Sequence, residues 1–302
     1  MRYPQLGRYP AARHIIAQVS DTHLLHGGAP LGGAADTVGA LAQFCDQLER
    51  LGDSIDAIVV TGDVADLGEP DAYRLAREAL EPLAERVAAQ LVWVMGNHDE
   101  RAAFRTELLL EPAAESPVHR IVDVDGLRVI ALDSTVPGYH HGELDESSLD
   151  WLDAALAEPA EHGTVIAMHH APIATPLALM DVLELRGQER FAEVVRGSDV
   201  RLILGGHLHY STNGSFAGIP VSVAGATAYT MDLSAPPRAL VGIDGGRSFS
   251  LVHLFDEGLV TSVVPVGRFP AVTSFGEEYL AELEALPADE RLDRFSRKRP
   301  AQ

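Results

Sequence analysis

The stretch Leu91-Val-Trp-Val-Met-Gly-Asn-His-Asp99 is an apolar run that ends in a glycine and three polar side chains. A short run of this composition predicts a buried strand. Ligands of open α/β sheets bind at the carboxyl ends of the strands. We therefore expect Asn97 and His98 to lie at the ligand-binding edge of a sheet.

The same arrangement of an apolar run followed by metal-binding side chains occurs at four other places. Val19-Ser20 leads into Asp21-Thr22-His23, Val60-Thr61 into Gly62-Asp63, Ala167-Met168 into His169-His170, and Leu204-Gly205 into Gly206-His207-Leu208-His209. Each motif alone is an ordinary turn or tripeptide. All five in order, each at the end of a strand-like run, predict one site to which the strand ends converge.

Between the first runs, residues 34–51 and 69–89 carry apolar side chains at three and four residue spacing. This spacing predicts helices with one buried face, so the first hundred residues follow a βαβαβ pattern. Beyond Val118, seven apolar runs lie closer together, and several are joined by turn signals such as Asp125-Gly126. We expect them to form a second sheet, antiparallel or mixed.

The fold class that this pattern predicts is α/β, an α+β sandwich of two central mixed sheets flanked by helices. Further helices are expected at residues 145–157, 188–196 and 277–286. Residues 1–270 are predicted to form the catalytic domain and residues 271–302 a helical, basic appendage. The basic side chains of that appendage are read as a solvated tail, and they are Arg291, Arg294, Arg297, Lys298 and Arg299.

Composition limits the classes of partner and site. The 302 residues include 46% hydrophobic side chains, but no apolar run approaches the roughly 18 residues that a membrane span needs, and the first residues do not resemble a signal peptide. We expect a cytoplasmic protein. A formal net charge of −21 argues against nucleic acid as a partner. An anionic substrate would need local positive charge, which bound metals can supply.

The ligands available for such metals are carboxylates, an amide and imidazoles, because Cys45 is the single cysteine of the chain. This set suits Zn, Mn and Fe. In an extended segment, the spacing of two in Asp21-x-His23 and His207-x-His209 would place both side chains of each pair on one face. Glycines before Asp63, Asn97 and His207 would permit tight or positive-φ turns.

The ordered set Asp-x-His, Gly-Asp, Gly-Asn-His-Asp, His and Gly-His-x-His resembles the calcineurin-like metallophosphoesterase superfamily, over residues 15 to about 266. Four longer segments resemble the class III cyclic-nucleotide phosphodiesterases of actinobacteria and their glycerophosphodiesterase relatives. These are Gly62-Asp-Val-Ala-Asp66, Val92-Trp-Val-Met-Gly-Asn-His-Asp99, Pro137-Gly-Tyr-His-His-Gly142 and Gly206-His-Leu-His-Tyr-Ser-Thr-Asn213. The resemblance implies a two-sheet sandwich, a homodimer and a small anionic phosphodiester as substrate.

The resemblance also implies a ligand set for two metal ions, a mixed pair drawn from Fe, Mn and Zn. One ion would be bound by Asp21, His23, Asp63 and His209, and the other by Asp63, Asn97, His169 and His207, so that Asp63 bridges. Two adjacent metals can generate a hydroxide nucleophile and neutralise charge on a phosphoryl group. His98 is expected to assist the leaving group, because an imidazole changes protonation near neutral pH.

The catalytic residues predicted in this way are His98, Asp63 and Asn97, and substrate contacts are expected from His98, Asn97 and His140. Asp66 and Asp99 are expected to orient ligand histidines. Of the pair His140 and His141, His140 is favoured at the site. His170 is read as a packing residue, and the histidines at 14, 26, 119, 162 and 253 are assigned no role.

Three functions follow as hypotheses. The first is metal-dependent hydrolysis of 3′,5′-cyclic AMP to 5′-AMP. The second is a glycerophosphodiesterase, or an enzyme acting on 2′,3′-cyclic nucleotides or a broad set of diesters. The third is a scaffold without activity, in which metals only hold the strand ends together.

Overall fold

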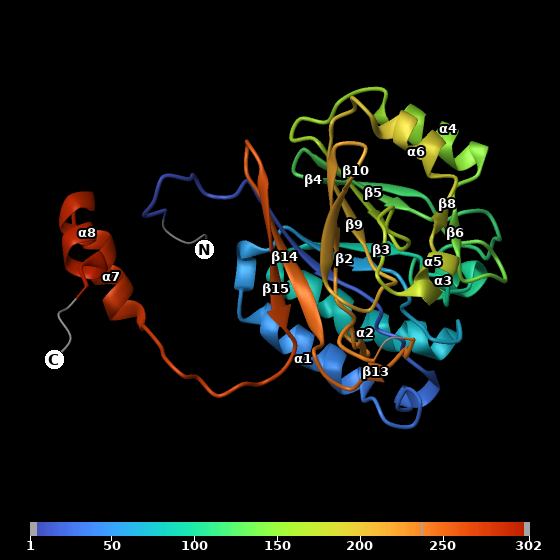
Figure 1. The fold of residues 1–302 in the computed structure, drawn as a ribbon, viewed down its shortest axis with the longest axis horizontal. Coiled ribbons are helices and arrows are strands. Elements are labelled where there is room, and N and C mark those ends of the chain that lie inside the picture. Colours follow the sequence, from blue (N-terminus) through green and yellow to red (C-terminus); the bar gives the residue numbers. More distant parts are fainter. Residues whose placement is uncertain (1–4, 237, 299–302) are drawn as a thin grey trace.

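The computed structural model describes residues 5–236 and 238–298, so Arg299 lies outside the described residues. Two β-sheets face each other and form the body, with helices on the outer face of each (Figure 1). The predicted sandwich of two mixed sheets between helices is confirmed. Among the described residues, no helix combines the length and the apolar character that a bilayer span requires.

The first sheet contains the strands of the predicted βαβαβ unit. Its order is β15 (Leu259–Pro265), β14 (Ser248–Leu254), β1 (His14–Val19), β2 (Ala57–Thr61) and β3 (Gln90–Val94). β1, β2 and β3 are parallel, whereas β14 and β15 are antiparallel to their neighbours. The runs of β14 and β15 were expected in the second sheet. They return to the first because β14 pairs with the free side of β1.

The second sheet has the order β10 (Thr212–Phe216), β11 (Ile219–Val223), β9 (Val200–Gly205), β7 (Thr164–Met168), β5 (Leu127–Leu132) and β4 (Arg120–Val124). The four central strands are parallel, and only the pairs β10–β11 and β4–β5 are antiparallel. Two small sheets join β6 (Gly142–Glu143) to β8 (Leu185–Arg186), and β12 (Thr230–Met231) to β13 (Gly242–Ile243).

The helices form the outer layers. α1 (Thr37–Glu49), α2 (Pro70–Val87) and α3 (Arg101–Glu107) cover the first sheet, while α4 (Glu146–Leu156) and α6 (Gln188–Val195) cover the second; α5 (Ala178–Val182) and two 3₁₀ turns, His26–Gly28 and Gly52–Ser54, are short. α1 begins three residues later than expected because the Asp36 carboxylate caps it by accepting from Gly39 N at 2.8 Å.

Successive side chains of β2 point alternately to the helices outside the first sheet and to the second sheet. Ile58 and Val60 pack with the apolar faces of α1 and α2, whereas Ala57 and Val59 pack against side chains of the second sheet. A third apolar cluster lies between the second sheet and α4 and α6. Each sheet is therefore buried on both faces over much of its area, which explains the near-continuous apolar runs of the parallel strands.

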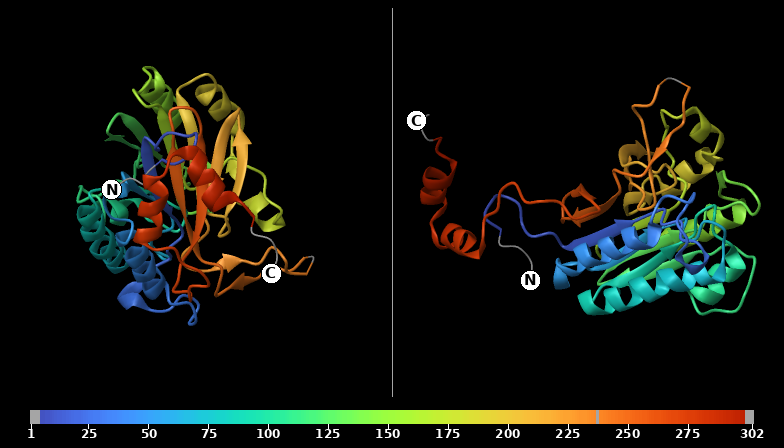
Figure 2. Two further views of the ribbon diagram at one scale, coloured as in Figure 1. Left: turned by 90° about the vertical axis from the view of Figure 1, so that its left-hand side faces the viewer. Right: turned by 90° about the horizontal axis from the view of Figure 1, so that it is seen from below.

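The chain leaves the body after β15 and continues to a pair of helices, α7 (Glu277–Ala285) and α8 (Ala288–Ser296), which stands apart from both sheets (Figure 2). Arg291 donates to Leu6 O and so links these helices to the N-terminal segment. The sequence predicted the first helix but not α8, whose composition is strongly polar. The division into a catalytic domain of residues 1–270 and an appendage of residues 271–302 stays a prediction.

Candidate metal centre and active site

The five motifs meet at the carboxyl ends of five strands. β1, β2 and β3 of the first sheet lead to Asp21, His23, Asp63, Asn97 and His98, and β7 and β9 of the second lead to His169, His207 and His209. Ligand atoms of Asp21, His23, Asp63 and His209 all lie within 4.8 Å of one another, and those of His169, His170 and His207 form a second such group. Six of the seven predicted metal ligands fall in these two groups, and the seventh, Asn97, has its Oδ1 3.1 Å from His169 Nε2.

The two Asp/His-x-His segments are not extended. Asp21 and His23 have φ of 53° and 42°, and His207 and His209 have φ of 70° and 57°. The expectation that spacing of two in a strand aligns each pair was therefore wrong. These residues follow the strands, and left-handed backbone turns direct their side chains inward. Such φ values are rare outside glycine, and they cluster at functional sites.

The glycines of the motifs act mainly by allowing close approach. Gly62 has a positive φ of 91°, and a Cβ on Gly62 would lie 2.5 Å from His169 Nδ1. Gly96 and Gly206 do not adopt a positive φ, but a Cβ on Gly96 would lie 2.1 Å from Asp63 N, and one on Gly206 would lie 2.1 Å from Ser20 Oγ. Only glycine lets these loops pack so closely around the site.

Each ligand histidine uses one ring nitrogen for a hydrogen bond to a protein oxygen. His23 Nδ1 pairs with Asp66 Oδ1 at 2.8 Å, His169 Nδ1 with Thr61 O at 2.8 Å, His209 Nδ1 with Tyr229 O at 3.2 Å, and His207 Nε2 with Leu183 O at 3.1 Å. Donation to these oxygens leaves a lone pair on the other nitrogen of each ring. This pattern is typical of metal-binding histidines.

The lone pairs face other acceptors, and this provides a test of whether the residues fit metal ions. His23 Nε2 lies 3.0 Å from His209 Nε2, and His169 Nε2 lies 3.1 Å from Asn97 Oδ1. Two acceptors at this distance repel unless a proton or a cation lies between or beside them. The donor set, imidazole nitrogens with carboxylate and amide oxygens, suits divalent transition metals. The residues present therefore fit two metal ions.

The charges around the ligand histidines also indicate a site that binds cations. Burial alone would lower the pKa of His169, but the negative charge of Asp63, 3.2 Å away, raises this pKa to about 9. The pKa of His23 is also raised, since Asp66 and Asp63 outweigh its burial. A proton on these rings is stabilised by the buried carboxylates, so the site attracts positive charge.

Asp21 and Asp63 are almost completely buried. Along the described chain, neither forms a salt bridge with a lysine or arginine within 4.0 Å. Burial would raise the pKa of Asp63, but neighbouring histidines, His169 foremost, hold it well below its usual value. Buried carboxylates are costly unless protonated histidines or metal ions neutralise them.

Asp66 and Asp99, the two carboxylates expected to orient ligand histidines, make different contacts. Asp66 contacts the ligand His23, as predicted. Asp99 was expected to orient a histidine, and this was wrong: its carboxylate accepts from the backbone N–H groups of Gly96, Ala65 and Val64. Asp99 thereby holds the Gly62-Asp63 and Gly96-Asn97 loops together. Burial first, and then the charge of Asp63, raises the pKa of Asp99.

His98 lies at the site with one nitrogen engaged. His98 Nδ1 donates to Asp66 O at 2.8 Å, and the His98 backbone N–H donates to Asp63 Oδ1 at 2.8 Å. The side chain is 31% exposed and lines the central cavity. Nε2 has no hydrogen bond to another described residue, so it is available to a bound molecule.

His140 joins the site from the loop after β5. Its Nδ1 lies 2.8 Å from Asn97 Nδ2, and its ring centroid lies 5.0 Å from that of His98. Because the amide N–H donates to Nδ1, the proton of neutral His140 is on Nε2. His141 points elsewhere and packs on Tyr139, with the ring centroids 5.3 Å apart. The structure thus places the favoured histidine of this pair at the site.

The structural role of His170 was not predicted from the sequence. This buried ring lies 2.9 Å from Ser134 Oγ through Nδ1, and its Nε2 donates to the carbonyl of His140 at 3.2 Å. Burial, followed by the charge of His169, lowers the pKa of His170 to about 3, so the ring is neutral. A Cβ on Gly142 would lie 2.5 Å from His170 Cγ. His170 therefore anchors the loop that carries His140.

Replacing His170 with alanine is expected to lower kcat/KM by about 10- to 100-fold, the range found when groups that support a metal-site residue are removed. The reason is that the 136–142 loop loses its anchor and His140 loses its position. A His170→Gln variant should recover part of the activity, because its amide N–H can reach His140 O. Steady-state kinetics with circular dichroism to check folding make the measurement.

A double variant and a control on the same loop make this prediction specific. If His170 acts through His140, the combined His140→Ala, His170→Ala variant should be no slower than His140→Ala alone. Losses that multiply would contradict it. His141→Ala, a change on the same loop, should leave kcat/KM within about twofold of wild type, as for most surface substitutions.

Comparison with known proteins identifies the family. Residues 14–211 match the family model described as calcineurin-like phosphoesterase. A cAMP/cGMP dual specificity phosphodiesterase of Mycobacterium tuberculosis is 48% identical over 267 residues, covering 88% of this chain and 84% of that protein. A Rhodococcus erythropolis protein named "Probable cyclic nucleotide phosphodiesterase" is 49% identical over 264 residues, covering 87% of each chain.

The fold is also similar to that of a yellow lupin purple acid phosphatase. That structure has a TM-score of 0.58 and 12% identity, and the match covers 85% of this chain and 52% of the phosphatase chain. At this identity the likeness concerns the fold alone. With the family model spanning residues 14–211 and the close relatives covering most of the chain, this protein belongs to the calcineurin-like phosphoesterase family.

Proposed function

We propose that the chain is a metal-dependent phosphodiester hydrolase whose main reaction is the cleavage of 3′,5′-cyclic AMP to 5′-AMP. The observation that carries this proposal is the convergence of seven N and O ligands at five strand ends beside His98, whose Nε2 has no hydrogen bond to another described residue. The names of the two relatives at 48% and 49% identity support a cyclic nucleotide as the substrate.

The proposed ligands form two sets that share one carboxylate. Asp21, His23, Asp63 and His209 would hold one ion, and Asp63, Asn97, His169 and His207 the other. We propose a mixed pair drawn from Fe, Mn and Zn, because all donors are nitrogen or oxygen. Two bound ions would neutralise phosphate charge and lower the pKa of a water at the site toward 7.

The remaining chemistry belongs to residues of the chain. With Nδ1 fixed by Asp66 O, protonated His98 can give the Nε2 proton to the departing alkoxide oxygen. The Asp66 carboxylate lies beside this ring, with its Oδ1 3.6 Å from His98 Nδ1. His140, protonated on Nε2, can donate to a phosphate oxygen, and Asn97 orients it.

A panel of diesters tests the substrate. After metal reconstitution, kcat/KM should be highest for 3′,5′-cyclic AMP among cyclic AMP, 2′,3′-cyclic AMP and glycerophosphocholine. If cyclic AMP is cleaved no faster than glycerophosphocholine, the cyclic-nucleotide proposal fails and the broader diesterase hypothesis takes its place. An Asn97→Ala variant that binds less metal yet keeps its cellular function would favour the scaffold hypothesis instead.

Two finer expectations stay predictions. Association into a homodimer is supported by β15, which lies at the edge of the first sheet with Val260 and Val263 about half exposed. Sedimentation analysis would measure the oligomeric state. A cytoplasmic location rests on the sequence alone.

A further inference from the structure

The cavity over the metal ligands has two chemically different halves. Its volume is about 620 Å³, and its floor is formed by His98, His140 and five of the ligand residues, namely His23, Asp63, Asn97, His207 and His209. Its rim is apolar. The rim side chains that matter are Leu31, Leu179, Met180, Leu183, Met231 and Ile243. A phosphodiester needs only the polar floor, so the apolar rim requires another part of the substrate.

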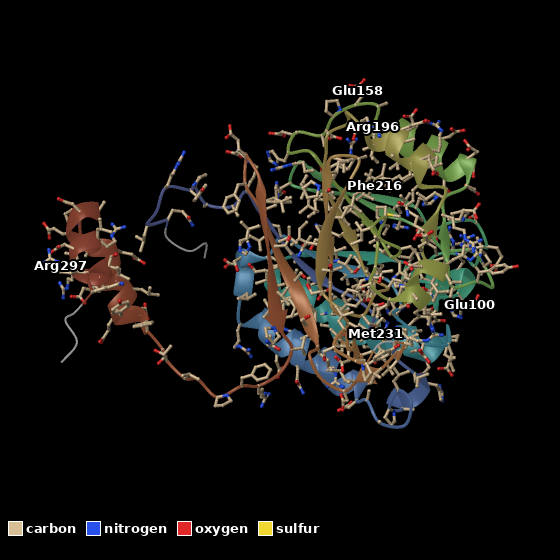
Figure 3. The ribbon with its side chains drawn as sticks, viewed as in Figure 1. Glu100, Glu158, Arg196, Phe216, Met231 and Arg297 are labelled. Carbon is tan, nitrogen blue, oxygen red and sulfur yellow. The ribbon has the colours of Figure 1, made fainter. Side chains whose placement is uncertain are left out.

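Five of the six rim side chains, all except Leu31, belong to two walls, and each wall is tied to a histidine of the Gly-His-x-His motif. The wall formed by α5 and Leu183 is held at Leu183, whose carbonyl accepts from His207 Nε2 at 3.1 Å. The wall of the β12–β13 hairpin is held at Met231, whose N–H donates to His209 O at 3.3 Å. In Figure 3 Met231 lies on the body, far from Arg297 of the C-terminal helices. The two hydrogen bonds to His207 and His209 fix the position of the walls relative to the proposed metal ligands.

Apolar side chains of the rim are partly exposed to solvent, which indicates that a bound molecule covers them. Leu179 is 47% exposed and Ile243 is 40% exposed, although both face a cavity. Met180 and Met231, one from each wall, add thioether groups that pack well against flat aromatic rings. Apolar surface at a cavity mouth next to a polar floor is typical of sites for small amphipathic ligands.

We propose that this rim, Leu179 and Ile243 with Met180 and Met231, is a nucleobase subsite that holds the planar base of a cyclic nucleotide while the floor holds its phosphate. The inference deepens the proposed function and rests on it. Choline or glycerol headgroups are small and polar, and they would leave the rim in water. The rim is thus the element that selects nucleotides over diesters without a base.

Equilibrium binding of two monoesters tests the subsite directly. Calorimetry on the metal-loaded protein compares adenosine 5′-monophosphate with ribose 5-phosphate, which lacks the base. We expect the nucleotide to bind at least about tenfold more tightly, as the burial of one ring face predicts. In Leu179→Asp this advantage should fall below about threefold, because a charge next to the base is desolvated.

The same helix offers a matched control. Val182, in α5, is 60% exposed and does not line the cavity, so Val182→Asp should keep the full preference. If Leu179→Asp weakens both ligands by one factor, or the wild type does not prefer the nucleotide, the subsite does not exist. Failure of the proposed function has a different result, namely that the metal-loaded wild type does not turn over cyclic AMP.

Discussion

Changing Asp63 to asparagine is expected to reduce kcat/KM for cyclic AMP by a factor on the order of a thousand or more, since this carboxylate is the one ligand shared by both proposed metal sites. Asparagine keeps the size of the side chain, and its oxygen can still accept from His98 N, as Asp63 Oδ1 does at 2.8 Å. The loop geometry should persist while the negative charge is lost. Kinetics and metal content on the same sample measure the effect.

Stability separates this effect from misfolding. In metal-free protein at neutral pH the free energy of unfolding of Asp63→Asn should fall by about 3 kcal/mol, because the protonated His169 ring loses its carboxylate partner. Asp199, a largely buried carboxylate at the opposite end of β9, pairs with Arg128 at 2.9 Å. Asp199→Asn should lose about 3 kcal/mol of stability and keep its kcat. The opposite pattern would refute the role of Asp63.

Replacing His98 with alanine is expected to lower kcat for cyclic AMP by about 100- to 1,000-fold, within the range for removing a general acid. The loss should depend on the leaving group. A nitrophenolate leaves without a proton, so hydrolysis of bis(4-nitrophenyl) phosphate should fall by less than about tenfold. Measuring kcat for both esters over a range of pH gives the comparison.

His140→Ala serves as the control for this leaving-group test. Since His140, which pairs with Asn97, is proposed to donate to a phosphate oxygen and not to the departing oxygen, its loss should affect both esters by similar factors. Equal losses for both esters in His98→Ala would show that His98 does not protonate the leaving group. The binding of the phosphate would then be its role.

The fold was predictable where one physical rule dominated. The runs around Val60, Trp93 and Ile166 are buried on both faces, and their apolar character defined the parallel strands. The placement of β14 and β15 was not predictable. Their pairing beside β1 joins segments more than 200 residues apart, and hydrophobic periodicity contains no information on which strand edge is free.

The site was predictable in composition but not in local geometry. The positions of Asp63, Asn97 and His169 follow from strand ends alone. The positive φ of His207 and the anchoring role of His170 do not, because they depend on contacts between distant loops. His170 resembled a packing residue because it precedes Ala171-Pro172, whereas Ser134 and His140 O, its partners, lie 30 or more residues away.

The central claim is that one buried centre binds two metal ions through ligands that share Asp63 and that hydrolysis requires them. Metal analysis of the purified protein, joined to turnover of cyclic AMP before chelation, after chelation and after reconstitution, tests it most directly. We expect two ions per chain, loss of turnover with the metals and recovery on their return. Full turnover by metal-free protein would contradict the account.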